Sequence, residues 1–507
     1  MYRIKTMCSL ACLTFTAQAV QATQPKVSET RSTKLPNILM ILVDDLGKEW
    51  LEPFGSNSML TPAINRLAEQ GTVYTNAYSM PQSTPSRVAL LTGQYPYHNG
   101  WINHYDVPRW GHGVNFDSSL NPCYPQILKK LGYHTCIAGK WQINDFRLEP
   151  DALEKAGFDS YCMWTGAEKD NEKVSDSRYW DPYIYTKEGS KVYKGLFGPD
   201  IYSDFIVSFM KEHRHEPMFI YYPMTLTHTP FVATPLNREA KTRNERHRAM
   251  VAYTDYIVKK LMTTLDDLDL RKDTYIIFTT DNGTTSAVVG ERNHEYIRGG
   301  KTYLSQNGIN APMITICPQS EKHHVSDALI DFTDIYPTVL DLAGIKNTDS
   351  RIDGHSFADI IRGTTNIGKR QYALSMGGLC ATIGTDDRVH NFCSFRERAI
   401  IGQRYKLYLT RAREVSRIYD LINDPFEKEN LIDNQELVSK VIASFQEEIN
   451  NQPVKDNDPI YHKIIPTIYN EPAEHLNRMS QGAKKRHKDF LGVSTQKEYL
   501  EFIHSEN

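Results

Sequence analysis

The sequence has no excess of charge of either sign. Its 507 residues contain 58 Lys and Arg against 61 Asp and Glu, which gives a formal net charge of −3. This balance provides no overall field that would attract a nucleic acid or an anionic membrane. The hydrophobic and charged fractions, 40% and 23%, are those of an ordinary globular protein. We therefore expect no nucleic-acid partner, and any anionic ligand must be recognised locally.

Long apolar runs are missing beyond the N-terminus, so no later segment resembles a membrane span. The first 22 residues begin with Arg3 and Lys5, continue through a mainly apolar stretch and reach small residues at Ala17, Ala19 and Ala22. This pattern is typical of a secretory signal peptide over residues 1–22; a buried first helix is the alternative. The cysteine that follows Ser-Leu-Ala is a poor match to a lipidation box. We expect an exported protein, periplasmic or secreted, without a stable membrane anchor.

Paired cysteine motifs are also missing. The chain has eight cysteines, of which two lie in the first 22 residues. The other six are Cys123, Cys136, Cys162, Cys317, Cys380 and Cys393. Because none of them forms a C-x-x-C pair, the sequence argues against a zinc site. A disulfide between Cys380 and Cys393 and a set of buried free thiols both remain open in an exported protein.

Apolar runs alternate with helical patterns along most of the chain. Strand-like runs cover 37–43, 135–138, 218–222, 274–280 and 312–317, and helical patterns cover 62–70, 122–131, 200–213, 245–266 and 332–343. Continuous apolar runs are typical of strands that are buried on both faces of a parallel sheet. The alternation therefore predicts an α/β fold with helices on both faces of the sheet.

The pattern changes near residue 370. Short strand-like segments at 371–376, 396–402, 405–411 and 416–421 follow one another without long helices between them, which predicts a small antiparallel subdomain. We divide the chain into a signal peptide (1–22), a large α/β domain (23–370), a C-terminal antiparallel-sheet subdomain (371–450) and a polar tail (451–507). The sequence assigns no role to the tail.

Polar side chains follow four of the apolar runs. They are Asp44 and Asp45 after the first, Lys140 after the second, His228 within six residues of the third, and Asp281 and Asn282 after the fourth. The carboxyl ends of strands in an open α/β sheet meet at the edge where ligands bind. Carboxylate and amide oxygens are hard donors that suit Ca²⁺ or Mg²⁺. Either acidic pair alone would equally suit a turn or a helix cap, but both pairs at one edge favour a metal.

A second segment predicts an anion site. In Ser83-Thr84-Pro85-Ser86-Arg87, Thr84 can cap a helix and Pro85 suits its first turn, which places Ser83 just outside the helix N-terminus. The exposed N–H groups and the dipole of such a terminus favour a negative charge. Arg87 lies one turn further on and can reach back toward Ser83. These features by themselves indicate an anion site and do not make Ser83 a nucleophile.

The same segment, followed by Leu91-Thr92-Gly93, resembles the signature of the type I (formylglycine-dependent) sulfatases of the alkaline phosphatase superfamily. Similar segments occur in the family's order from residue 36 to about 431: PNILMILVDDLG, GYHTCIAGKW, THTPF, FTTDNG, GGKTY, DIYPTVLDLAG and IYDLINDPFEKENL. The resemblance implies a large, mixed but mostly parallel sheet between helices, with a small C-terminal antiparallel sheet. The domain over 23–370 would then be catalytic.

The resemblance also implies roles for individual residues. Asp44, Asp45, Asp281 and Asn282 would bind Ca²⁺, with Mg²⁺ as the alternative, and Ser83, oxidised to formylglycine (3-oxoalanine) by a maturase that acts on serine, would complete the site. Arg87 would hold the second oxygen of the nucleophile. Lys140 and Lys301 would bind the sulfate oxygens, and His228 would protonate the leaving group.

Two positions depart from the family pattern. The family usually has a histidine two residues after the lysine of its GKW motif, where this chain has Gln142. The role of that histidine, which helps to position or deprotonate the formylglycine hydrate, is therefore lost or moved. The segment 305–312 also lacks the Arg-Val-Pro of many members, which indicates a divergent substrate loop.

The family and the signal peptide suggest a bacterial enzyme that acts on a sulfated carbohydrate. Two aromatic and basic clusters are candidates for sugar contacts or for core packing: Trp101, His104, Arg109, Trp110 and His112, and then Trp164, Arg178 and Trp180. Two alternatives stay open. One is a phosphomonoester or phosphonate hydrolase of the same superfamily that uses unmodified Ser83. The other is a catalytically inactive glycan-binding homologue, with Gln142 as the lesion.

Overall fold

The computed structural model describes most of the chain between Leu35 and His462. The described ranges are 35–57, 59–102, 115–146, 149–164, 178–318, 323–347, 349–377, 381–383, 388–391 and 394–462. The expected signal peptide, the Cys380 and Cys393 pair, and His104, Arg109, Trp110 and His112 lie outside these ranges. Cys123, Cys136, Cys162 and Cys317 are buried free thiols.

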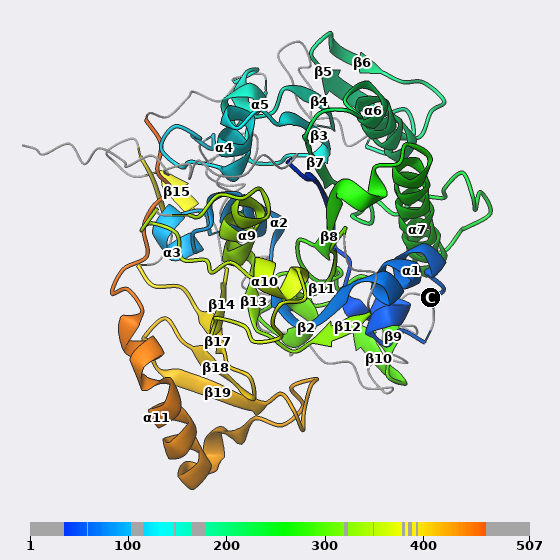
Figure 1. Ribbon diagram of the computed structural model, residues 1–507. Coiled ribbons are helices and arrows are strands. Elements are labelled where there is room, and N and C mark those ends of the chain that lie inside the picture. Colours follow the sequence, from blue (N-terminus) through cyan, green and yellow to red (C-terminus); the bar gives the residue numbers. More distant parts are fainter. Residues whose placement is uncertain are drawn as a thin grey trace, which may run out of the picture.

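A large mixed sheet forms the centre of the molecule (Figure 1). Its strands occur in the order β12-β2-β11-β8-β1-β7-β3-β4-β5-β6, and β13 pairs with β2 beside this row. The bounds are β1 Asn37–Val43, β2 Thr72–Tyr78, β3 His134–Lys140, β4 Ser160–Trp164, β5 Tyr183–Thr186, β6 Gly189–Val192, β7 Met218–Pro223, β8 Thr274–Thr280, β11 Asn310–Ile316, β12 His324–Ser326 and β13 Ile330–Asp331. The central strands β8, β1, β7, β3 and β4 are parallel, so their carboxyl ends share one edge.

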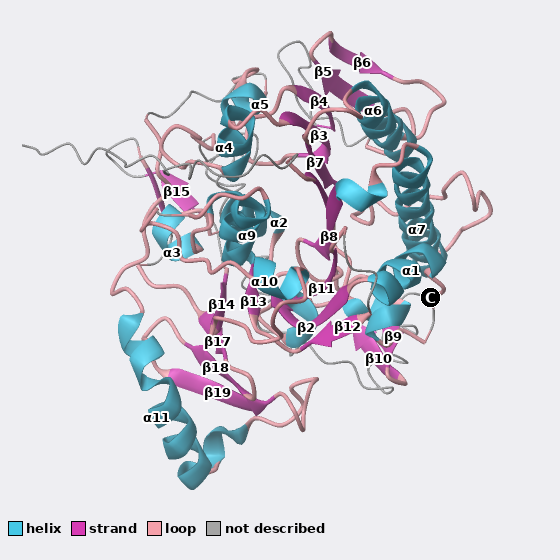
Figure 2. Ribbon diagram, viewed as in Figure 1, coloured by secondary structure: helices cyan, strands magenta, loops and turns pink. Residues whose placement is uncertain are grey.

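Helices cover both faces of this sheet (Figure 2). The face of β1 that carries Ile38 and Met40 packs in one core with α2 Ser83–Thr92, α4 Tyr124–Lys130, α9 Ile335–Leu342 and α10 Ala358–Ile361. The other face, with Leu39 and Ile41, packs with α1 Pro62–Gln70, α6 Gly198–Glu212 and α7 Arg243–Asp267. Every residue of β1 is buried, because side chains that alternate in direction meet helices on both sides.

Short elements connect these layers. They are the 3₁₀ helices η1 Lys48–Trp50, η2 Glu52–Phe54, η5 Arg271–Asp273, η6 Phe332–Asp334 and η7 Leu431–Asp433, the short helices α3 Pro96–Asn99, α5 Ala152–Lys155 and α8 Gln306–Ile309, and the hairpin of β9 Val289–Arg292 and β10 Glu295–Arg298. Among the described residues, no helix combines the length and the apolar character that a membrane crossing requires.

A small antiparallel sheet follows in the C-terminal part of the chain. Its order is β14 (Ala373–Met376), β17 (Arg398–Ile401), β18 (Tyr405–Leu409) and β19 (Val415–Asp420). Helix α11 (Gln435–Asn451) packs on it through Val441 and Phe445, and β15 (Ala381–Ile383) pairs separately with β16 (Val389–Asn391). Asp456, in the segment predicted as a polar tail, forms a buried ion pair with Arg398 at 2.6 Å, so this part of the tail is integrated into the fold.

The predicted α/β sheet and C-terminal antiparallel sheet are confirmed, one prediction needs correction, and the structure decides or adds two further points. Helix α2 begins at Ser83 itself, with Gln82 as its N-cap, so Ser83 lies in the first turn and not just outside it. Trp101 is fully buried in the core, which excludes it as a sugar contact. The long helix α11 follows a region predicted to hold strands alone.

Candidate active site

Four parallel strands deliver the predicted polar residues to one edge of the sheet. Asp44 and Asp45 follow β1, Lys140 ends β3, His228 lies five residues after β7, and Asp281 and Asn282 follow β8. Backbone hydrogen bonds join the segments beyond the strands: the Asp281 N–H donates to the Val43 carbonyl, and the Asp44 N–H donates to the Leu226 carbonyl. The structure therefore brings together the residues that the strand ends predicted.

Side-chain oxygens from two segments, 44–45 and 281–282, gather around Ser83. Ser83 Oγ lies 3.3 Å from Asp44 Oδ1 and 3.3 Å from Asn282 Oδ1. The amide nitrogen of Asn282 donates to Asp45 Oδ1 at 2.7 Å, and the Asp45 N–H donates to Asp281 Oδ1 at 3.2 Å. The three carboxyl groups, Asn282 and Ser83 are all buried. The predicted ligand set is thus one compact cluster of hard oxygen donors around Ser83.

Three cationic side chains balance the three buried carboxylates. Lys140 Nζ lies 2.7 Å from Asp44 Oδ2, and Lys301 Nζ lies 2.7 Å from Asp45 Oδ2. The Arg87 guanidinium donates to Asp281 Oδ2 at 2.6 Å and lies 3.6 Å from Asp44. Buried charges persist only when they are paired or bind a metal. A divalent cation among these oxygens would take over part of that pairing and release the ammonium groups, so the donor set fits Ca²⁺.

The electrostatics of the two aspartates differ. Burial alone would raise the pKa of Asp44, but Lys140, Arg87 and Lys301 outweigh it and lower the pKa to about 2. Burial raises the pKa of Asp45, and the repulsion of Asp44 and Asp281 adds to the effect although Lys301 opposes it. Burial lowers the pKa of Lys140 to about 7 despite the attraction of Asp44. Asp44 is therefore the carboxylate that stays ionised under all ordinary conditions.

His228 lies on the Asp45 side of the cluster. Its Nε2 is 3.7 Å from Asp45 Oδ2, and its Nδ1 is 2.7 Å from the Thr229 carbonyl oxygen. The shorter contact places the ring proton on Nδ1, where it can donate to the carbonyl. Burial and the nearby charges of Lys301, Lys140 and Arg178 lower the pKa of His228 well below its usual range. The imidazole is therefore neutral in the free site.

Helix α2 places Ser83 where an anion is favoured. The helix starts at Ser83, carries Pro85 in its first turn and ends at Gly93, whose φ of 68° suits a residue without a side chain. All ten residues of the helix are buried, so its N-terminal dipole acts in a medium of low dielectric constant. Gln142 Nε2 lies 3.4 Å from Thr84 Oγ1. The residue that replaces the family's histidine is therefore beside the nucleophile position.

A close approach of backbone explains the glycine before Lys140. Gly139 has a φ of 109°, and a Cβ there would lie 2.1 Å from the Pro223 carbonyl oxygen. Any larger residue would push β3 away from β7 and withdraw Lys140 from Asp44. The Gly-Lys sequence is thus a packing requirement of the site.

The loop that carries Lys301 is held by the C-terminal sheet, a contact that the sequence analysis missed. Glu427 accepts a hydrogen bond from the Gln306 N–H at 2.6 Å and another from the Tyr408 hydroxyl at 2.6 Å. Lys406 forms an ion pair with Glu427 at 2.8 Å and donates to the Leu304 carbonyl at 2.5 Å. The segment IYDLINDPFEKENL contains Glu427, but nothing in it indicates a contact with a loop about 120 residues earlier.

We expect Glu427→Gln to destabilise the protein by about 3 kcal/mol, because Lys406 is fully buried and would lose its ion pair with Glu427. The Lys301 loop would loosen with it, which lowers turnover. The matched control is Glu295→Gln, which breaks the exposed Lys428–Glu295 pair and should cost less than about 1 kcal/mol. Thermal unfolding measures both variants. If both substitutions lowered the stability equally, Glu427 would not hold the Lys301 loop against the C-terminal sheet.

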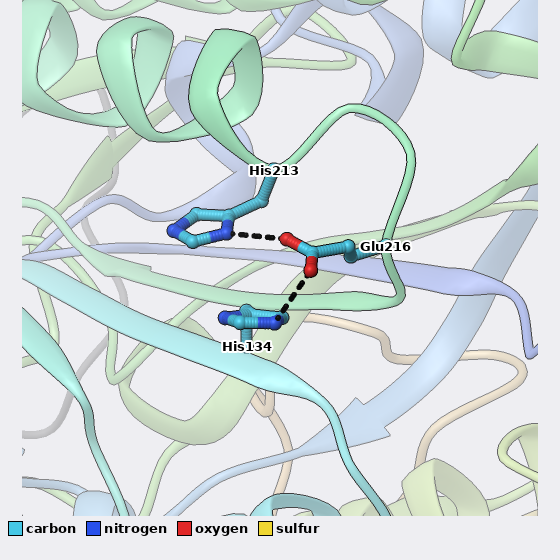
Figure 3. A group of neighbouring side chains, drawn as sticks. All are labelled: His134, His213 and Glu216. Atoms are coloured by element: carbon cyan, nitrogen blue, oxygen red, sulfur yellow. Dashed lines mark hydrogen bonds and ion pairs between the residues drawn. The ribbon is translucent and has the colours of Figure 1, made fainter.

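A second cluster of ligand-type side chains lies at the opposite end of β3 (Figure 3). The carboxylate of Glu216 lies 2.9 Å from His213 Nδ1 and 3.3 Å from His134 Nε2. The two imidazole rings are stacked, with centroids 4.2 Å apart and planes 22° apart. Two imidazole ligands converge on a metal ion, whereas the nitrogens of these stacked rings point side by side toward the carboxylate. We therefore interpret the cluster as hydrogen-bonded surface packing.

Comparison with known proteins identifies the class of this chain. The Sulfatase family matches residues 36–345, and the C-terminal domain of N-sulphoglucosamine sulphohydrolase matches residues 294–455. The first match covers more than half of the chain, so the protein belongs to the sulfatase family.

Individual relatives give a narrower picture. Human N-acetylgalactosamine-6-sulfatase is 31% identical in an alignment that covers 63% of this chain and 64% of the human protein. This chain thus spans less than two thirds of that relative. The N-acetylgalactosamine-6-O-sulfatase of Bacteroides thetaiotaomicron is 26% identical over 83% of this chain and 94% of its own length. The crystal structure of Ps i-CgsB in complex with k-i-k-neocarrahexaose has the same fold, with a TM-score of 0.69 and 22% identity over 90% of this chain and 99% of that chain.

Proposed function

We propose that this protein hydrolyses sulfate monoesters of a carbohydrate, with a formylglycine nucleophile made from Ser83 and a bound Ca²⁺. One observation carries the proposal: Ser83 Oγ, in the first turn of a buried helix, lies within 3.4 Å of Asp44, Asn282 and Lys140. An anion-binding helix terminus, a hard-metal donor set and a buried cation thus meet at one side chain.

The metal ligands and the modified residue follow from this cluster. Asp44, Asp45, Asp281 and Asn282 hold the cation together with the Ser83 side chain, and Mg²⁺ is the alternative ion. Bound there, Ca²⁺ supplies positive charge that acidifies and orients a nucleophilic oxygen. Formylglycine supplies that oxygen as an aldehyde hydrate. A maturase that acts on serine is required to make formylglycine from Ser83. A plain serine hydroxyl would be a weak nucleophile without an adjacent base.

The remaining residues act on the substrate. Lys140 and Lys301 lie on either side of the carboxylate pair and bind the equatorial oxygens of the sulfate group as negative charge develops there. Arg87 donates to Asp281 and to the Lys140 carbonyl, and in this fixed position it orients the nucleophile. Gln142 takes the place of a histidine beside Thr84 and can position the hydrate by hydrogen bonding, although it cannot accept its proton.

His228 donates a proton to the departing alcohol oxygen. Its neutral resting state follows from burial and from the charges of Lys301 and Lys140. A bound sulfate ester offsets those two charges, which favours protonation of the imidazole only when the substrate is in place. Proton donation by His228 therefore depends on the charge of the bound substrate as well as on the imidazole itself.

The names of the relatives support a sulfated carbohydrate as substrate. Two of them are sulfatases of N-acetylgalactosamine 6-sulfate by name, and another relative, from Formosa agariphila, is named as active on ulvan. With the N-terminal pattern of residues 1–22, we propose an exported bacterial enzyme of polysaccharide degradation.

The decisive experiment compares matched sulfate and phosphate esters of 4-nitrophenol and a panel of monosulfated and disulfated saccharides. We expect turnover of sulfate esters that exceeds turnover of phosphate esters by at least ~10²-fold. The reason is that Asp281 and Asn282 follow β8, without the Asp-His pair that a second, histidine-rich metal site of a phosphatase would need. A preference for phosphate would support the hydrolase of the same superfamily that uses unmodified Ser83. Complete inactivity of the matured protein would support the inactive glycan-binding homologue.

Calcium removal should abolish the activity and also destabilise the protein. Three buried carboxylates lie within one cluster, so a bound divalent cation stabilises the folded state by mass action. We expect EDTA to lower both the turnover and the midpoint of thermal unfolding, and Ca²⁺ to restore both. Asp281→Asn should weaken the response to Ca²⁺, whereas the exposed Asp269→Asn should not. Unchanged activity in EDTA would contradict the metal assignment.

A further inference from the structure

One buried cation near the active site is not used by the proposed reaction. The side chain of Arg178 is only 7% exposed, and its Nε is buried without a hydrogen-bond partner. Its Nη1 lies 3.2 Å from His228 Nδ1. The same nitrogen lies 2.7 Å from the Thr229 carbonyl oxygen, and one tautomer cannot both donate to that carbonyl and accept from Arg178, so the shorter contact competes with the arginine for it. Within the described part of the chain, no carboxylate forms an ion pair with Arg178.

The position of this guanidinium is fixed by the sheet. It stacks on the ring of Trp164 at 3.9 Å from the centroid, and Trp164 is the last residue of β4. Trp164 pairs with Lys140 in the register of β3 and β4, so the two residues end neighbouring strands at the edge that carries the site. The imidazole of His228 links Arg178 to the cluster: its Nδ1 lies 3.2 Å from Arg178 and its Nε2 lies 3.7 Å from Asp45, which pairs with Lys301. The cation therefore faces the leaving-group side of the sulfate position.

The Nε of Arg178 thus has no acceptor and its Nη1 competes for one, and a buried guanidinium in that state is costly unless a ligand supplies acceptors. Guanidinium groups bind carboxylate and sulfate oxygens in a bidentate manner, and stacking on an indole ring fixes the plane of the group in advance. A neutral sugar hydroxyl would satisfy a single N–H but would leave the charge unpaired. The missing partner is therefore an anion.

We propose that Arg178 binds a second anionic substituent, a sulfate or a carboxylate, on the saccharide whose sulfate ester is cleaved. The substrate class is thus a polyanionic saccharide in which another acidic group lies close to the scissile ester, and Arg178 determines this specificity. The inference rests on the proposed function, since it assigns the leaving-group side from the role of His228.

The test measures a ratio of kcat/KM values on matched substrates. One pair is N-acetylgalactosamine 6-sulfate and its 4,6-disulfate, and another is glucosamine 6-sulfate and its 2-N,6-O-disulfate. Every other saccharide of the panel is likewise measured in a monosulfated and a disulfated form. For each saccharide that is turned over, we expect the wild type to prefer the disulfated member by about 10- to 100-fold, the scale of a charge-assisted bidentate contact. Arg178→Ala should reduce this ratio to near one, and Arg178→Lys should keep part of it.

The ratio is independent of how much of a variant is folded, because both substrates are measured on the same sample. It also cancels any effect of Arg178 on His228 that is common to both substrates. The matched control is Arg417→Ala, which removes an arginine stacked at 3.8 Å on Tyr408 in the C-terminal sheet and should leave the ratio unchanged. A wild-type ratio near one, or a ratio that survives Arg178→Ala, would overturn the inference. Absence of turnover on every substrate would instead overturn the proposed function on which it rests.

Discussion

Ser83→Ala should reduce turnover of sulfate esters by at least ~10³-fold, because the substitution removes the only precursor of the nucleophile. The folded protein should survive, since the contacts of Ser83 Oγ with Asp44, Asn282 and Lys140 are long, at 3.3 to 3.4 Å. We expect a change in unfolding free energy of no more than about 1 kcal/mol. Steady-state kinetics and thermal unfolding on the same preparation measure the two effects.

The matched control for this variant is Ser86→Ala. Ser86 is also buried in the same helix, but its hydroxyl donates to the Met80 carbonyl at 3.0 Å and not to a carboxylate of the cluster. We expect turnover within about threefold of the wild type, because no group near the sulfate position changes. Comparable losses in the two variants would mean that helix packing, and not the Ser83 side chain, governs the activity.

Lys140→Ala should lower kcat/KM by ~10²–10³-fold, the usual effect of removing one group that stabilises developing charge. Its ammonium lies 2.7 Å from Asp44 and 3.4 Å from Ser83 Oγ, so it adjoins the position of the sulfate group. Lys301→Ala should have an effect of similar size from the Asp45 side.

Lys48→Met provides the comparison for these lysines. Lys48 is also buried, and its ammonium donates to the Thr75 carbonyl and to Asn310, away from Ser83. Burial lowers the pKa of Lys48 well below the ordinary lysine value, and neither of its two contacts is a residue of the cluster around Ser83. We expect less than a tenfold loss of kcat/KM. Wild-type-like turnover in both Lys140→Ala and Lys301→Ala would show that the sulfate pocket lies elsewhere.

The catalytic cluster could be predicted from the sequence because of the way parallel sheets are built. Strands such as β1 and β8 are buried on both faces, so their sequences are continuous apolar runs with sharp ends. The polar residues after those ends, Asp44 and Asp281 among them, then converge at one edge. The distance between them along the chain does not matter, because parallel strands align their carboxyl ends.

Edge strands could not be predicted in the same way. In β6 (Gly189–Val192) most residues are exposed, so the segment has neither an apolar run nor an alternating pattern. Helix α11 lies almost entirely within the predicted subdomain 371–450, but it buries only Val441 and Phe445, which is too little apolar character to predict a helix there. Both elements owe their conformation to tertiary packing more than to local pattern.

The environment of Arg178 also could not be derived from the sequence. Its grouping with Trp164 and Trp180 was predicted, but the contact with His228 joins residues that are 50 positions apart. The same holds for Glu427 and the Lys301 loop, which meet only because the C-terminal sheet packs beside the site. Such contacts depend on how whole elements pack, and local periodicity contains no information about that.

Mass spectrometry of the peptide that contains residue 83 tests the central claim most directly. In active protein that was produced together with a serine-type maturase, the account predicts a mass decrease of about 2 Da at Ser83, since oxidation of the hydroxyl to an aldehyde removes two hydrogens. Activity should rise in proportion to the converted fraction across preparations. A fully active protein in which Ser83 remains an unmodified serine would contradict the account.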